Sequence, residues 1–131
     1  MEEALVAFLL ADAALAALVV KRINWQTRPQ GEALPAIVLQ RVSGVRDYAM
    51  AGPTGLVESR VQVDCWGKTH ASALAVARRV RALLSGLRTE VSGTQLQGTF
   101  VLLERHSFEK ESDGAQALHR VMMDFQIWHS E

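Results

Sequence analysis

The sequence predicts one α+β domain spanning residues 1–131, with elements in the order α-β-β-α-β-β. Three observations lead to this fold class. The chain begins with an Ala- and Leu-rich stretch, later stretches alternate apolar and polar residues, and a helical apolar stripe lies between the two pairs of strands. We expect a four-stranded, mainly antiparallel sheet with long hairpins and with both helices packed on one face.

The first predicted helix covers residues 1–20. Ala and Leu are strong helix formers, and an acidic start followed by Lys21 and Arg22 suits the helix dipole. Residues 4–20 are too short and carry Asp12 too centrally for a membrane span, since a central Asp costs about 2.5–3.5 kcal/mol on insertion. The acidic start is also unlike a secretory signal. We therefore expect a helix of a soluble domain.

The strands are predicted from alternation and turn residues. Residues 23–26 have the composition of a short strand, and residues 36–48 form the first long one after Pro35. The Gly-Pro-Thr-Gly sequence within residues 50–55 predicts a turn, so that residues 43–56 form a long hairpin tip. Residues 56–66 alternate cleanly. The positions of one face are Val57, Ser59, Val61, Val63 and Cys65; those of the other are Glu58, Arg60, Gln62, Asp64 and Trp66.

The second half repeats this layout. Thr69 is a predicted N-cap for a helix over residues 70–84, and Gly86 is a predicted stop. Strands are expected at residues 99–108 and 117–129, with a polar hairpin tip at residues 109–116. The last strand alternates as well. One of its faces carries Val121, Met123, Phe125 and Ile127, and the other Arg120, Met122, Asp124, Gln126 and Trp128.

Composition restricts the function. Fourteen basic and fourteen acidic residues give a net charge of zero, which disfavours a protein whose main task is to grip phosphates. The single cysteine, Cys65, excludes an intramolecular disulfide. The hydrophobic fraction of 49% is slightly high for a small monomer and indicates that some apolar surface meets another subunit.

Residue patterns for catalysis, cofactors or metals are weak. Cys65 precedes a helix, so a reactive thiol is one interpretation and a small buried hydrophobe the favoured one. His106 would face His119 across the second hairpin if the register allowed it, but two ligands make a poor metal site. The acidic residues of the second tip lack the spacing of a calcium loop. Arg78, Arg79, Arg81 and Arg88 lack the interleaved aromatic residues of a nucleic-acid surface. We expect no catalytic, cofactor or metal site.

The polar strand faces are the remaining unusual feature. Charged residues alternate there with tryptophans, and Trp and Arg concentrate binding energy in protein interfaces. An ordinary solvated sheet face is the equally weighted alternative. The candidate subunit or partner interface comprises Trp25, Arg46, Tyr48, Glu58, Arg60, Asp64, Trp66, Arg120, Asp124 and Trp128.

Several stretches resemble a known family. They are LLADAALAAL at residues 9–18, Arg22-Ile23, LPAIV at residues 34–38, GLVESRVQVDCWG at residues 55–67, and the helix carrying residues 73–80. Together they resemble the tail-completion, or tail-terminator, family of long-tailed bacteriophages and phage-like gene transfer agents. The stretch at residues 56–66 is the most specific part, and the resemblance runs over nearly the whole chain.

The resemblance implies a non-enzymatic virion protein at the head–tail junction, assembled in the cytoplasm of a host bacterium. It implies a homo-oligomeric ring, commonly hexameric, that caps the head-proximal end of the tail tube and stops tube polymerisation. The implied partners are the tail tube protein and the head connector or stopper, with DNA in transit through the ring and no membrane. Three alternatives stay open: another connector or stopper component, a small cytoplasmic α+β enzyme or ligand-binding domain using Cys65 or the His106/His119 pair, and a nucleic-acid-binding module.

Overall fold

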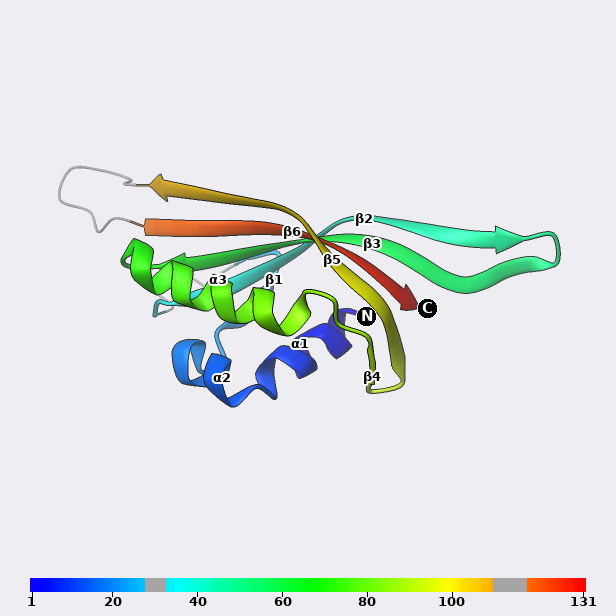
Figure 1. The fold of residues 1–131 in the computed structure, drawn as a ribbon, viewed down its shortest axis with the longest axis horizontal. Helices are drawn as coiled ribbons and strands as arrows, with labels where there is room; N and C mark the ends of the chain where they lie inside the picture. Colours follow the sequence, from blue (N-terminus) through cyan, green and yellow to red (C-terminus); the bar gives the residue numbers. More distant parts are fainter. Residues whose placement is uncertain (28–32, 110–117) are drawn as a thin grey trace.

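A computed structural model describes residues 1–27, 33–109 and 118–131 of the chain. The predicted α+β class is confirmed, but these residues form three helices and six strands, so the predicted four-stranded sheet is wrong (Figure 1). The elements in chain order are α1 (Glu2–Leu10), α2 (Ala13–Val19), β1 (Ile23–Trp25), β2 (Ala36–Ala49), β3 (Gly52–Gly67), α3 (His70–Leu84), β4 (Thr89–Val91), β5 (Thr94–Glu109) and β6 (Leu118–Ser130).

The strands form a strongly curled sheet in the order β1-β2-β3-β6-β5-β4. The four long strands pair antiparallel in the centre, as the alternation predicts, and β1 is parallel to β2. The two additional strands, β1 and β4, are the edge strands of the described sheet, and each has three residues. Three residues are too few to establish an alternating pattern, which is why β4 was not predicted.

The first predicted helix is interrupted at Asp12. The backbone of Asp12 is extended, and its carboxylate accepts a hydrogen bond from the Leu15 N–H at 2.8 Å. This is N-cap geometry, so a new helix begins at Ala13. The same carboxylate holds Arg79 of α3 by two hydrogen bonds of 2.7 and 2.8 Å. Asp12 therefore ends the uninterrupted helix and joins α2 to α3.

Helix α3 has the limits that the sequence predicts. The Thr69 hydroxyl accepts the Ser72 N–H at 3.1 Å, and Gly86 adopts φ +74 just beyond the end of the helix. Gly67 is needed where β3 meets α3, since a Cβ atom there would lie 2.6 Å from the Ala73 nitrogen. The glycine lets the helix approach the sheet closely.

The three helices lie on one side of the sheet, where the core is (Figure 1). The face of β3 and β6 that the sequence predicts to be apolar is buried there, with Phe125 as the largest fully buried side chain. The polar pair His129 and Ser59 is also buried on this face, with the Nε2 and Oγ atoms 2.7 Å apart. Within the described part of the chain, no helix covers the opposite side of the sheet, which we call the open face.

The β2–β3 hairpin is longer and its turn tighter than predicted. Strand pairing continues to Ala49 and Gly52, so the turn consists of Met50 and Ala51. We call the end of this hairpin, residues 43–56, the arm; it projects beyond the C-terminus and away from the helices (Figure 1). The predicted second tip, residues 109–116, lies outside the described residues apart from Glu109, which ends β5.

Candidate functional site

The open face carries a ladder of polar pairs across β3 and β6. The Gln126 amide donates to the Glu58 carboxylate, and the next pair along the strands joins Arg60 to Asp124. The Arg60 Nη2 and Nε atoms lie 2.5 and 3.2 Å from Asp124 Oδ2. Three predicted interface residues, Glu58, Arg60 and Asp124, therefore lie together, and each has a side-chain partner within the chain.

The ladder continues toward α3. The Gln62 amide donates to both carboxylate oxygens of Asp64 at 3.1 and 3.2 Å, and Arg120 Nη1 lies 3.9 Å from Asp64 Oδ2. The Arg120 guanidinium also lies over the Trp66 ring, 5.2 Å from its centroid, in a cation–π contact. The ladder thus ends in the cation–π pair of Arg120 and Trp66.

Two carboxylates of the ladder are buried. Asp64 and Asp124 are only 8% and 6% exposed. Burial raises the pKa of Asp64 and repulsion by Asp124 adds to the rise, while the Gln62 amide and Arg120 oppose it. The Asp124 Oδ1 atom is buried and has no hydrogen-bond partner among the described residues. Because a buried unpaired oxygen is costly, this carboxylate depends strongly on Arg60.

Apolar side chains flank the ladder on the β5 side. Register pairing places Phe100 and Leu103 on the open face, and they are 51% and 43% exposed. Phe100 and Trp128 line a shallow hollow of about 290 Å³ together with Leu56, Gln97 and Gly98. Trp128 is therefore part of this hollow, so the open face combines a polar ladder with an apolar margin, as interfaces between proteins do.

Arg46 and Tyr48 lie on the arm, away from the ladder. Every residue from Val42 to Ala51 is exposed. Arg46 Nε lies 2.7 Å from a Glu131 carboxylate oxygen, in an ion pair whose two side chains are each 48% exposed. The structure therefore divides the predicted interface residues between the open face and the arm, and leaves Trp25 apart from both.

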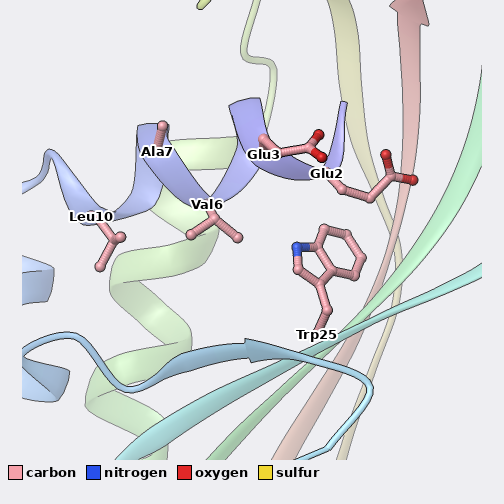
Figure 2. A pocket seen from close by; sticks show the side chains of 6 residues that line it. All are labelled: Glu2, Glu3, Val6, Ala7, Leu10 and Trp25. Carbon is pink, nitrogen blue, oxygen red and sulfur yellow. The ribbon is translucent and has the colours of Figure 1, made fainter.

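Trp25 lies on the helix side, in a groove between α1 and β1. Figure 2 shows its ring turned toward α1, with the indole nitrogen on the side of Val6. The groove has a volume of about 390 Å³ and is lined by Val6, Ala7, Leu10 and Trp25, with Glu2 and Glu3 at one end. The Trp25 Nε1 atom is buried without a hydrogen-bond partner among the described residues. Sequence reasoning marked Trp25 but missed the groove, which forms only where α1 packs beside β1.

His70, His106 and His119 lie close together in an arrangement that the sequence did not predict. The strand register places His106 opposite Val121 and His119 opposite Phe108, so the predicted facing pair does not form. His106 Nδ1 instead lies 3.0 Å from Nε2 of His70 on α3, and the His119 ring centroid is 6.3 Å from that of His70. Within the described residues, no group of three or more His, Cys, Asp or Glu side chains is arranged to hold a metal ion.

Cys65 is fully buried on the core side of β3. Burial, with the negative charges of Asp64 and Glu104, raises the pKa of its thiol far above the ordinary value. A thiolate is the reactive form of cysteine, so the structure favours the interpretation of Cys65 as a small core residue. None of the described helices is both long enough and apolar enough to cross a membrane.

Comparison with known proteins decides the family. The family model described as tail completion protein gp17 matches residues 3–130. The chain belongs to this family. The resemblance seen at residues 9–18, 34–38 and 55–67 is thereby confirmed. In this tail completion protein those stretches correspond to the end of α1 with most of α2, the start of β2, and most of β3.

One solved structure shares the fold of the tail completion protein. A chain in the structure described as "Virion of native gene transfer agent (GTA) particle" superposes with a TM-score of 0.77, covering 100% of this chain and 95% of its own. The two are 22% identical, so the likeness shows the fold. A second solved chain has a TM-score of 0.49 at 19% identity, over 96% and 89% of the two chains, and supports no argument. No curated protein matches the sequence.

Proposed function

We propose that this tail completion protein is a non-enzymatic virion component of a phage or a gene transfer agent particle. It forms a ring, commonly hexameric, at the head-proximal end of the tail tube, where it stops tube polymerisation and joins the tail to the head connector. DNA passes through the ring. The family match over residues 3–130 supports this proposal.

The open face of the sheet is the structural observation that supports this proposal. One side of the sheet packs under three helices, while the other presents pre-paired charges, Trp66 and an apolar margin around Trp128. Aromatic and Arg side chains are typical of the residues that hold protein interfaces together. The net charge of zero suits a conduit, because a strongly basic ring would hold the DNA by its phosphates.

Microscopy of particles with the protein labelled tests the position. We expect label at the head–tail junction of every tailed particle. Label along the tube or at the distal tip would overturn the proposal. Particles assembled without this protein should contain tubes of uncontrolled length that do not join heads. Tubes of normal length that remain detached from heads would instead identify a connector or stopper component.

A second experiment separates the structural role from a catalytic one. Cys65→Ala and His119→Ala should leave particle assembly and DNA delivery at the parental level, because neither side chain belongs to the open face or the arm. Normal particles that have lost DNA delivery in either variant would instead favour an enzyme or a ligand-binding domain.

A further inference from the structure

The arm carries large apolar side chains that its own chain leaves uncovered. Val45 and Tyr48 are 62% and 67% exposed, and Met50 at the turn is fully exposed. A two-stranded ribbon in water gains little stability by itself, and a cluster of exposed apolar side chains at its end marks a binding surface. Because the arm points away from the helices (Figure 1), a partner must come from outside the chain.

The α1–β1 groove is an apolar hollow, whereas the arm is an apolar projection. Its walls are apolar, from Val6, Leu10 and the ring of Trp25, and the Trp25 N–H beneath them lacks an acceptor among the described residues (Figure 2). An occupant that suits this groove brings apolar side chains. Tyr48 and Met50, which are exposed on the arm, supply them.

The arm and the groove also match in charge and in length. Glu3 lies at one end of the groove and has no ion-pair partner among the described residues, while Arg46 on the arm is held only by an exposed pair with Glu131. Exposed pairs of this kind are weak and easily exchanged. Along α1, Glu3 and Leu10 are about 10 Å apart at 1.5 Å per residue. Along the arm, Arg46 and Ala49, the last residue of β2, are about 10 Å apart at 3.3 Å per residue, and Met50 follows in the turn.

We propose that the arm of one copy lies in the α1–β1 groove of a second copy, with Met50 near Leu10, Tyr48 over Val6 and Arg46 beside Glu3. This inference rests on the proposed ring. The arm and the groove are different surfaces of the same chain, so each contact is head-to-tail, and a head-to-tail contact that closes on itself generates a ring.

Engineered cysteines test the contact in assembled particles. The double variant Met50→Cys/Leu10→Cys should form disulfide-linked dimers and larger multimers under mild oxidation, because a disulfide needs Cα atoms within about 7 Å. Native Cys65 is buried and does not compete. The matched control is Met50→Cys/Leu102→Cys, since Leu102 on β5 is also exposed, at 49%. The control and the Met50→Cys single variant should stay monomeric on a non-reducing gel.

The outcomes separate this inference from the proposed function. Multimers of the control or of the Met50→Cys single variant would overturn the arm-in-groove contact. A Met50→Cys/Leu10→Cys variant that stays monomeric would overturn it as well. Label at the head–tail junction of the same particles would show that the ring proposal survives such a result. As a second measurement, Glu3→Lys and Arg46→Glu should each reduce the yield of tailed particles, and combining them should restore it. A double variant no better than its components also overturns the contact.

Discussion

Removing Arg60 tests how strongly the ladder depends on one ion pair. Asp124 is almost fully buried, with its Oδ1 atom unpaired and its Oδ2 atom held by Arg60 at 2.5 Å. Arg60→Ala would leave this carboxylate with neither a side-chain partner nor full access to water. Breaking a buried pair costs about 3–5 kcal/mol and an exposed pair about 0–1 kcal/mol. The Arg60 side chain is 46% exposed, so we expect a loss of about 1–3 kcal/mol in the free energy of unfolding.

Arg46→Ala is the matched control. The Arg46 side chain is 48% exposed, close to the 46% of the Arg60 side chain. The side chain of its partner Glu131 is also 48% exposed, whereas the side chain of Asp124, the partner of Arg60, is only 8% exposed. Urea unfolding of the monomeric protein, followed by circular dichroism, measures both variants. With a slope of about 1–3 kcal/mol per molar urea, the Arg60→Ala midpoint should fall by about 1 M. The Arg46→Ala midpoint should stay within about 0.3 M of the parent. Equal midpoints for the two variants would refute the reasoning.

Three further predictions concern pH and packing. Burial holds the pKa of His129 below its usual value of 6.5, so the unfolded state binds more protons than the folded state. The free energy of unfolding should therefore fall as the pH drops below about 6.5. His129→Gln should flatten this dependence in urea titrations at about pH 8 and pH 5. Arg79 lowers the pKa of Asp12 to about 2, so the stability that Asp12 contributes is complete above its ordinary pKa of 3.8 and lost as the pH falls through about 2. Thermal melts of Asp12→Asn should lack that part of the acid dependence. Gly67→Ala should lower the free energy of unfolding by about 1–3 kcal/mol, because the added methyl group meets the Ala73 backbone; a melt unchanged from the parent would contradict this packing.

Local patterns predicted the central elements well. The limits of α3 follow from Thr69 and Gly86, two residues whose effect depends on a few neighbouring peptide groups. The core face of β3 follows from strict alternation, since each residue of a strand points away from its neighbour. The polar positions of the other face were predicted for the same reason, whereas the pairs that they form were not.

Features that depend on tertiary contacts were not predicted. Asp12 disturbed the apolar stripe of the first helix, but its ion pair with Arg79, 67 residues away, is a tertiary contact that no local pattern reveals. The α1–β1 groove requires the N-terminal helix to lie beside Trp25. The partner of His106 is His70 because α3 crosses the sheet near that strand, which no spacing within one strand reveals.

In the proposed assembly, the open face would serve as an interface whose charges are already paired within the chain. Arg60 and Asp124, like Arg120 and Trp66, hold each other before any partner arrives, so little side-chain freedom remains to be lost on association. Charges that are already paired attract an oncoming surface weakly, and their main effect is to reject a misaligned one. The affinity must then come mostly from apolar contact, which the hollow at Phe100 and Trp128 offers beside the ladder. In the proposed interface, such a face would fix the register of its partner through polar pairs and hold that partner through apolar area, so that raising the salt concentration should weaken the binding little.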